Sequence, residues 1–483
     1  MTHTPTGSAV PDVRARGAMP AQRGAAPSPP PGAPGPGRRR AWAEYAARLR
    51  AAATTEPGRL RIIGASLALL VVAFGAVTAW QVTDRSTAAD NVVKHSAPLS
   101  ASAAEIYRSL ADADATVTGG FLVGGQQPKD VSERYEKDIT TAAKLITDAA
   151  ANSEGSPQAR AQITALNWQL PKYVELVTTA QADNRQGLPV GGAYLRYANL
   201  QMRKDGGLLS AADKLYRIET DRLGSDYSHA KALPYVSWAL GAVALLALLW
   251  AQRRHYRRTN RVFNHGLLAA SAASAVVLLW LLAGHTVARN QLEHSDAHGA
   301  RSMQVLNNAR ISVLQARGDE NLTLVARGSG GEYEDNFSDG MDALAGKDPQ
   351  GVGGELAQAL ALADNAAGTD PVNAAVKSVQ TWRARHTAER KSDDAGDYTT
   401  AVAEVIGGKD SNGKTVDKTT GSCFDAVDAS LQKAVAQEQE EFKDAANSGR
   451  GALSLLPYGA ALLAVLAAAG AALGIGRRLS EYR

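Results

Sequence analysis

Four blocks of apolar residues divide this chain, and each is long enough to cross a membrane as a helix. The blocks cover residues 62–83, 232–252, 266–288 and 451–476, and none of them contains Asp, Glu, Lys or Arg. A hydrocarbon core about 30 Å thick requires roughly twenty apolar helical residues. We therefore predict four transmembrane helices. The first block is too long, and lies too far along the chain, for a cleaved signal peptide.

The positions of arginine predict how these helices are oriented. Arginine is concentrated in the segments 38–61, 253–265 and 477–483, each of which adjoins an apolar block. Positively charged segments beside membrane spans stay in the cytoplasm. This rule places both termini on the cytoplasmic side of a plasma membrane. It places the two long polar segments, 84–231 and 289–450, outside the cytoplasm.

The polar segments predict bundles of helices. In the first of them, Val131, Tyr135, Ile139, Ala142 and Ile146 recur at steps of three and four residues, and glycine or proline separates such stretches. Strand-like alternation is scarce. Helices whose first and last members join membrane spans form an up-down bundle. We therefore predict an all-α membrane protein, with four transmembrane helices and two extracytoplasmic up-down helical bundles.

The two halves of the chain also resemble each other, which predicts a tandem repeat. Residues 110–114 (LADAD), followed by a Gly-Gly pair at 124–125, correspond to residues 315–319 (QARGD), followed by a Gly-Gly pair at 330–331. Trp168 and Trp382 stand past the middle of the two polar segments, and we expect both rings in bundle cores. Within the second segment, residues 328–340 and 409–420 are predicted to be loops.

The segments assigned to the cytoplasm are small. Residues 1–37 are rich in Pro, Gly and Ala and are predicted to be disordered. Residues 38–61 are predicted to form a basic helix beside the membrane, whose Trp42 and Tyr45 either lie on anionic lipid or contact a partner. The loop 253–265 adds four candidate contact residues: Arg253, Arg254, Arg257 and Arg258. The tail 477–483 is too short to fold, so any output must pass to another protein.

No motif in the sequence predicts catalysis. It has no phosphate-binding glycine loop ending in Lys-Ser/Thr, no H-E-x-x-H zinc motif and no G-x-S-x-G nucleophile turn. We expect no enzyme activity, no catalytic residue, no cofactor and no metal. A net charge of only +4 gives no reason to expect a nucleic-acid partner. The lack of charged residues within the spans argues against a transporter.

The strongest candidates for a ligand- or partner-binding site lie just after the first span. They are Tyr107, Arg108, Asp112 and Asp114. Arg108 and Asp112 are four residues apart and therefore share one helix face, so a surface ion pair is the simpler interpretation of that pair.

The polar segments resemble the four-helix-bundle sensor domains of bacterial chemoreceptors and histidine kinases. More narrowly, two such hairpins without an output domain resemble the actinobacterial membrane proteins of the GlnX type. Residues 106–116 (IYRSLADADAT) and 120–125 (GFLVGG) carry this likeness. The resemblance implies two partners, an extracytoplasmic amino-acid-binding lipoprotein and the cytoplasmic Ser/Thr protein kinase G.

Two functions remain open from the sequence. One is a transmembrane signal relay that couples an extracytoplasmic solute-binding protein or ligand to a cytoplasmic Ser/Thr kinase or other effector. The other is a scaffold or assembly protein of the cell envelope that conveys no stimulus. Association of the chain with itself is compatible with either function.

Overall fold

The computed structural model describes residues 56–479 apart from 126, 154–155, 260–263 and 350–351. The chain divides into two compact units, Met1–Ile62 and Ile63–Arg483. The predicted tail 1–37 lies outside the described residues, as do Trp42 and Tyr45 in the predicted basic helix 38–61.

The described residues are almost entirely helical, so the all-α prediction is confirmed. The first half comprises α2 (Glu56–Asn91), the π-helical segment η1 (Val92–Ser96), α3 (Ala97–Leu122), α4 (Lys129–Asn152), α5 (Pro157–Arg185), α6 (Val190–Arg203), α7 (Leu208–Lys231) and α8 (Tyr235–Thr259). The second half comprises α9 (His265–His294), the π-helical η2 (Ser295–Ala300), α10 (Arg301–Val325), α11 (Gly331–Ala345), α12 (Gly354–Leu362), α13 (Ala366–Asp394), α14 (Tyr398–Ile406), α15 (Thr420–Ser454) and α16 (Leu456–Leu479).

The two halves begin and end with the same arrangement of helices. In each half, one helix runs without a break from an apolar block through a π-helical segment, over Glu56–Leu122 and over His265–Val325. The returning helix is interrupted in both halves next to a proline, Pro234 between α7 and α8 and Pro457 at the start of α16. Proline causes this because it lacks a backbone N–H and disfavours helix in the residue before it.

Local sequence accounts for most helix ends. Ser156 caps α5 by accepting a hydrogen bond from the backbone N–H of Ala159 at 3.2 Å, and Pro157 occupies the first helical position. Gly206 adopts a φ of +73°, which divides the polar residues before α8 into α6 and α7.

The predicted loop at 328–340 is wrong over most of its length. Helix α11 begins at Gly331, and Phe337, Met341 and Leu344 form its buried stripe. Acidic residues on the solvent face concealed this three- and four-residue spacing. In the region 409–420, the chain forms a two-residue hairpin, β1 (Gly408–Lys409) and β2 (Thr415–Val416), before α15.

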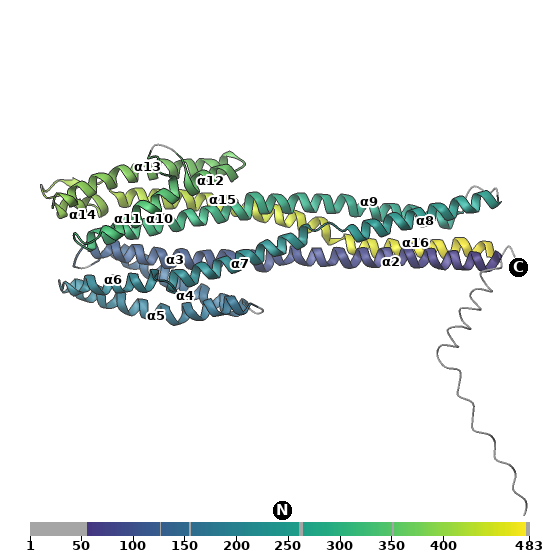
Figure 1. Cartoon of the computed structure of the whole chain (residues 1–483), viewed down its shortest axis with the longest axis horizontal. Coiled ribbons are helices and arrows are strands. Elements are labelled where there is room, and N and C mark those ends of the chain that lie inside the picture. The colour runs from purple at the N-terminus through teal and green to yellow at the C-terminus, as the bar shows by residue number, and fades with distance from the viewer. Residues whose placement is uncertain (1–55, 126, 154–155, 260–263, 350–351, 480–483) are drawn as a thin grey trace, which may run out of the picture. The chain divides into compact units, whose positions relative to one another are not determined.

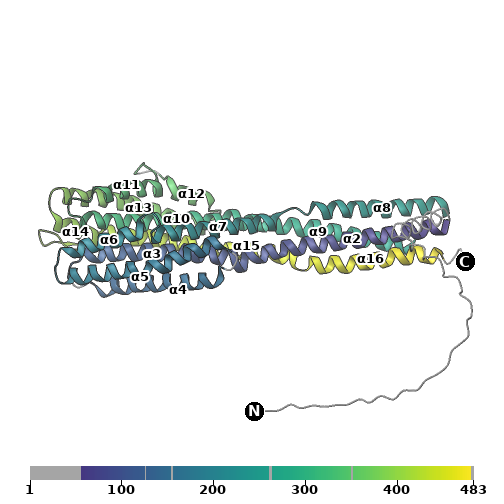
Figure 2. The ribbon, with the colours of Figure 1, turned by 60° about the horizontal axis from the view of Figure 1, so that its bottom comes forward.

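Four helical stretches are long and apolar enough to span a membrane, and they contain the four predicted blocks. Within residues 63–483, α2, α8, α9 and α16 pack together at one end, and the polar helices gather at the other (Figures 1 and 2). Small residues allow close contact in the apolar part. A Cβ atom on Gly474 would lie 3.0 Å from the Cα of Gly266. Gly241 leaves room for the ring of Phe74 in the same way.

An arginine stabilises the interruption between α7 and α8. Arg85 donates hydrogen bonds from Nε to the carbonyl of Ala232 at 2.6 Å and from Nη2 to the carbonyl of Leu233 at 3.2 Å. Both carbonyls stand where the helix is broken, and the carbonyl of Leu233 also accepts a hydrogen bond from the backbone N–H of Tyr235 at 3.0 Å. Hydrogen bonds from Arg85 therefore stabilise the break between α7 and α8 in the first half.

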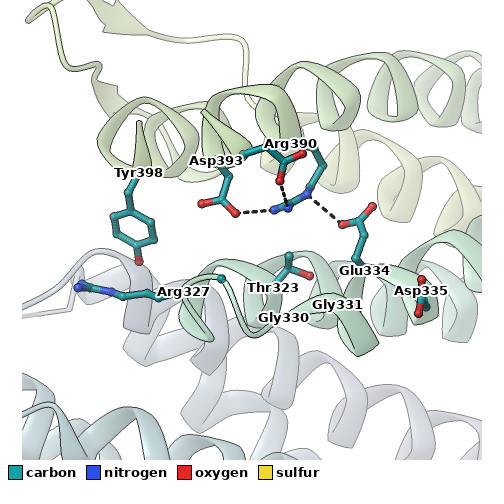
Figure 3. Close-up of a pocket in the computed structure, with 11 residues that line it drawn as sticks. Thr323, Arg327, Gly330, Gly331, Glu334, Asp335, Arg390, Asp393 and Tyr398 are labelled. Carbon is teal, nitrogen blue, oxygen red and sulfur yellow. Dashed lines mark hydrogen bonds and ion pairs between the residues drawn. The ribbon is translucent and has the colours of Figure 1, made fainter. Parts of the chain in front are cut away.

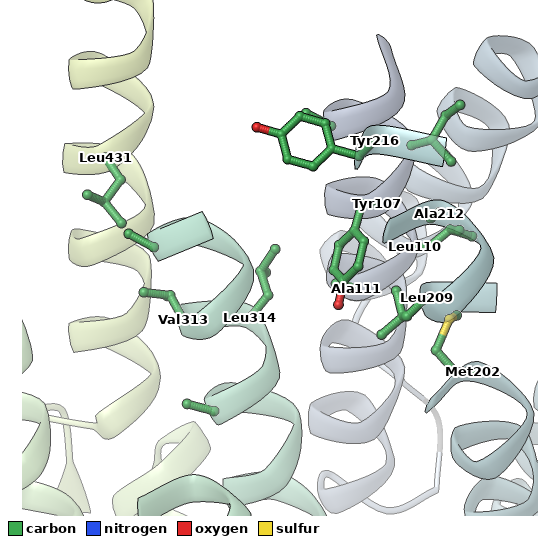
Figure 4. Packing of buried hydrophobic residues seen from close by; sticks show 14 of the residues in the cluster. Tyr107, Leu110, Ala111, Met202, Leu209, Ala212, Tyr216, Val313, Leu314 and Leu431 are labelled. Atoms are coloured by element: carbon green, nitrogen blue, oxygen red, sulfur yellow. The ribbon is translucent and has the colours of Figure 1, made fainter. Parts of the chain in front are cut away.

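One hydrophobic core extends through the polar helices of both halves. It includes Leu110 and Leu209 from the first half and Leu314 and Leu431 from the second (Figure 4). Trp382 is fully buried in it, which confirms one of the two tryptophan predictions.

The prediction for Trp168 is wrong, because its side chain is 69 % exposed. Leu166 and Leu170 place the buried stripe of α5 on the opposite side of the helix. The ammonium group of Lys172 lies 4.5 Å from the centre of the Trp168 ring.

Candidate functional site

Helices α3 and α10 lie side by side, and we call the contact between the two halves along them the seam. Side chains of α10 donate hydrogen bonds to α3 at two levels. Gln315 Nε2 donates to the hydroxyl of Tyr107 at 2.8 Å. Asn321 Nδ2 donates to the carbonyl of Ala115 at 3.1 Å and to the hydroxyl of Thr118 at 3.3 Å. The seam therefore contains specific polar contacts as well as apolar packing.

Arg203, at the end of α6, joins two buried aspartates across the seam. Its Nη1 donates to Oδ1 of Asp319 at 2.5 Å, and its Nε lies 3.6 Å from Oδ2 of Asp114. Gly318 makes room for this guanidinium, since a Cβ atom there would lie 2.5 Å from Arg203 Nη2. One guanidinium thus neutralises carboxylates from both halves, which occupy matching positions in the sequence repeat.

Further donors surround Asp114. Asn199 Nδ2 donates to it at 2.7 Å, and the Tyr173 hydroxyl donates at 3.3 Å. Burial raises the pKa of Asp114, and the charge of Arg203 and the Asn199 hydrogen bond oppose that rise. Burial likewise raises the pKa of Asp319, against the opposing effect of Arg203. The cluster depends on Arg203, because two buried carboxylates without a cation would repel each other.

Arg108 and Asp112 lie nearby, in the wall of a charged cavity of about 430 Å³ formed by α3, α4, α10 and α15. Arg108 Nη1 is 3.2 Å from Asp112 Oδ2, so the predicted ion pair exists, but the Asp112 side chain is only 6 % exposed. Arg134 also pairs with Asp112, at 2.7 Å, and reaches Asp425 of the second half at 3.4 Å. The pair therefore belongs to the seam and not to a free surface.

A buried carboxyl group lies beside this pair. Asp138 is 3 % exposed, and its Oδ2 has no hydrogen-bond partner among the described residues. Burial and the charge of Asp112 raise the pKa of Asp138 to about 7, although Arg108 opposes the shift. This part of the seam is therefore sensitive to proton binding near neutral pH.

The structure brings the four predicted site residues together on α3, but it assigns them different surroundings. Tyr107 and Asp114 are buried contacts of the seam, whereas Arg108 and Asp112 line a cavity. Their contact with a ligand or partner stays a prediction. Sequence reasoning missed Arg203, whose contacts with Asp114 and Asp319 span 89 and 116 residues of chain. The repeated motif that contains both aspartates was the only signal in the sequence.

The predicted cytoplasmic contact residues are placed only in part. Arg253, Arg254 and Arg257 lie near the end of α8, and the Arg254 guanidinium is 5.4 Å from the centre of the Trp250 ring. The side chain of Arg258 lies outside the described part of the structure.

A second candidate site lies where α10 ends, away from the four apolar helices; we call it the distal pocket. Its cavity of about 690 Å³ lies between the α10–α11 turn and the α13–α14 turn (Figure 3). Arg390 of α13 reaches across it to Glu334 of α11 at 3.4 Å. The guanidinium of Arg327 lies 4.7 Å from the centre of the Tyr398 ring. Cavities of this size commonly hold small molecules.

Buried charged groups connect this pocket to α10. Nε2 of His386 is 3.0 Å from Glu334, and its Nδ1 is 3.1 Å from Glu320, which is fully buried. Trp382 Nε1 also donates to Glu320, at 2.9 Å. Burial alone would lower the pKa of His386, but its hydrogen bonds with Glu320 and Glu334 raise that pKa to about 9. The imidazole is therefore charged at neutral pH and links α11 to α10.

Glu389 is the unusual member of this group. It is 1 % exposed, and neither of its oxygens accepts a hydrogen bond from a described residue, although His386 Nδ1 is 3.3 Å away. Burial raises its pKa to about 8, partly countered by His386. This carboxyl group is therefore mainly protonated at neutral pH.

Comparison with known proteins identifies one segment. No curated protein and no solved structure matches the chain. Residues 88–228 match the family described as an actinobacterial sensor domain. The match begins near the end of α2, ends within α7, and includes Tyr107, Arg108, Asp112, Asp114 and Arg203. A sensor domain suggests a sensing or signalling role. The first half of this chain, from residue 88 to residue 228, is thus similar to the actinobacterial sensor-domain family.

Proposed function

We propose that this protein relays a signal across a membrane, from an extracytoplasmic ligand or solute-binding protein to a cytoplasmic Ser/Thr kinase or other effector. The observation that carries the proposal is the pair of unbroken helices Glu56–Leu122 and His265–Val325. Each joins a segment able to span a membrane to the seam. Because a helix is stiff along its axis, a shift at the seam would move the attached span.

The two halves of the chain are also coupled between the seam and the apolar helices, close to the π-helical segments. The Tyr227 hydroxyl of α7 is 2.6 Å from the Ser295 hydroxyl of η2, which donates to the carbonyl of Phe442 at 3.1 Å. Lys231 of α7 pairs with Asp296 of η2 at 2.7 Å. Irregular helical turns of this kind often occur at functional sites. A movement of one half would therefore be transmitted to the other half before it reached the helices that span the membrane.

The seam supplies the two-state element that a relay requires. Its buried carboxylates and the arginines that pair with them, Arg203 and Arg134, form contacts whose partial disruption would leave buried charges unpaired. Separated and joined arrangements are therefore favoured over intermediate ones. An input that favours one arrangement needs only to bind it more tightly than the other.

The cytoplasmic receiver and the orientation are part of this proposal. With both termini in the cytoplasm, the seam lies outside and the basic segments 38–61 and 253–265 face the effector. The resemblance to GlnX-type proteins favours an amino-acid-binding lipoprotein as the input and protein kinase G as the receiver.

The direct test compares phosphorylation of kinase substrates before and after addition of external amino acids. Strains would carry a deletion of this gene, the wild-type gene, the seam variants Arg203→Met and Asn321→Leu, or the control Arg217→Met. Arg217 lies on α7 in an exposed pair with Asp213, so its loss should leave the response intact. We expect no response in the deletion strain and an altered response in the seam variants at equal membrane abundance.

A deletion strain that still responds to amino acids would refute the relay. If the deletion instead changes envelope integrity, and purification from solubilised membranes recovers neither a lipoprotein nor a kinase, the scaffold function is the correct one.

A further inference from the structure

The distal pocket contains an arginine in an unfavourable backbone conformation. Arg327 has a φ of +43° and is the only residue other than glycine with a positive φ in the described part of the chain. Side chains disfavour this region, and such residues cluster at functional sites. Glycine tolerates a positive φ without strain, as Gly328 does at the next position, so glycine could replace Arg327 at this turn. The chain nevertheless places an arginine at the edge of the pocket.

The guanidinium of Arg327 remains available for a ligand. It lies over the Tyr398 ring at 4.7 Å, but it makes no hydrogen bond or ion pair with the residues that the structure describes. A guanidinium offers several N–H donors in a plane, an arrangement that suits a carboxylate. One end of the pocket can therefore bind an anionic group.

Acidic side chains dominate the remaining wall. Four carboxylates line the pocket against two guanidinium groups. Arg390 is already engaged, with Asp393 at 2.7 Å, Asp394 at 2.8 Å and Glu334 at 3.4 Å. Asp335 has no hydrogen-bond or ion-pair partner in the described residues. Figure 3 shows Arg327 and Asp335 at opposite ends of the pocket, so its two unpaired charges are opposite in sign and separated.

We propose that the distal pocket binds a small zwitterion, with its carboxylate on Arg327 and its ammonium group on Asp335 and Glu334. A diamine of the same length would place one cation against Arg327, and a dicarboxylate would place one anion against the acidic wall. Among the described residues, no group of three or more His, Cys, Asp or Glu side chains could hold a metal ion, so an organic ammonium suits this wall better.

The contacts of Glu334 connect such a ligand to the seam. His386 forms hydrogen bonds with both Glu334 and Glu320, and Glu320 lies on α10. Glu320 stands between Asp319, which accepts a hydrogen bond from Arg203, and Asn321, which donates hydrogen bonds to α3. An ammonium group that attracts Glu334 competes with His386 and so changes the forces on this turn of α10. This coupling rests on the proposed relay, whereas the binding itself does not.

Binding can be measured by isothermal titration calorimetry on the full chain in lipid nanodiscs. One set of probes is the common α-amino acids, whose two charges lie close together. A second set is linear ω-amino acids from β-alanine to 6-aminohexanoate, in which the charges are further apart. Diamines and dicarboxylates of matching length serve as controls. We expect one zwitterion per chain to bind, and matched diamines and dicarboxylates to bind at least roughly tenfold more weakly.

Two variants locate the site. Arg327→Gly removes the guanidinium and suits the observed φ, so it should lower affinity roughly ten- to hundredfold without lowering the melting temperature. Asp335→Asn should lower the affinity for zwitterions by a similar factor and raise the affinity for dicarboxylates. Arg217→Ala is the control and should leave affinity unchanged.

The proposal is overturned if no zwitterion binds at millimolar concentration, if the controls bind equally well, or if both pocket variants retain wild-type affinity. These results are separable from those of the relay test. If binding is absent but the phosphorylation response is intact, the relay is supported and its stimulus acts at another site. If binding is confirmed but the response survives gene deletion, the pocket is supported and the relay is refuted.

Discussion

Arg203 of the first half donates a 2.5 Å hydrogen bond to Asp319 of the second half, and the same guanidinium lies 3.6 Å from Asp114. The side chain of Arg203 is 21 % exposed, whereas those of Asp114 and Asp319 are 3 % and 4 % exposed. A single residue therefore holds together two buried acids that face each other across the seam.

Replacing Arg203 with methionine should destabilise the protein by about 3–5 kcal/mol, because it leaves two buried carboxylates without a cation. The measurement is the melting temperature of the full chain in detergent or nanodiscs. Adding Asp319→Asn should restore part of the loss, since it removes one uncompensated charge. Arg217→Met, in its exposed pair with Asp213, should change stability by less than about 1 kcal/mol. If Arg203→Met and Arg217→Met lowered the stability equally, the role assigned to Arg203 would be contradicted.

Two glycines near the end of α16 form a matched pair for testing helix contact. A Cβ atom on Gly474 would lie 2.6 Å from Asn264 Oδ1 and 3.0 Å from the Cα of Gly266, whereas one on Gly476 would meet nothing within 4 Å. Gly474→Val should therefore separate α16 from α9 and cost about 1–3 kcal/mol. Gly476→Val should have little effect on thermal stability. A melting temperature lowered equally by both would show that α16 does not pack as described.

Stability should fall as the pH rises from about 6.5 to 9. The folded-state pKa of His386 is raised to about 9. Its stabilising contribution is therefore complete when the pH is below the pKa of His386 in the unfolded chain, and it is lost as the pH rises through 9. The pKa of Glu389 is raised to about 8, and its contribution is likewise lost as the pH rises through 8. Both groups bind protons more tightly in the folded state, so their effects have the same sign.

Glu389→Gln should make this pH dependence shallower, because the amide cannot ionise. Each fully titrating group changes the free energy of unfolding by about 1.4 kcal/mol per pH unit. The measurement is the melting temperature at half-unit intervals from pH 6 to 9.5. Glu133→Gln provides the control, since the Glu133 side chain is 64 % exposed. A wild-type protein that melts at the same temperature throughout this range would exclude the proposed titration.

The orientation is tested by labelling single cysteines in a Cys423→Ala background. The native thiol is 5 % exposed and must be removed first. Lys129→Cys lies at the start of α4, where the side chain is 89 % exposed, and Arg257→Cys lies near the end of α8. A membrane-impermeant maleimide should label only position 129 in intact cells and both positions after permeabilisation. Labelling of position 257 alone would reverse the orientation.

Residues in the candidate sites were predicted to different extents. The ion pair between Arg108 and Asp112 followed from their four-residue spacing on a helix. Its burial did not, because it depends on packing between helices: Arg134 of α4 pairs with Asp112 and also reaches Asp425 of the second half. The distal pocket was missed because part of it, from Gly331 onward, was assigned to a loop. Its other wall comes from α13 and α14, about sixty residues further along the chain.

The sequence by itself determined the four apolar helices and the helical character of the polar segments. Both depend on local properties, the length of apolar runs and the three- and four-residue spacing of buried positions. Only the tertiary structure decided which buried faces meet. Trp168 and Trp382 occupy similar places in the two halves, yet one is 69 % exposed and the other is fully buried. Periodicity reports that a helix has an apolar face, but the partner of that face is set by packing between distant segments. The contacts of Arg203 with Asp114 and Asp319 therefore became visible only in the folded chain.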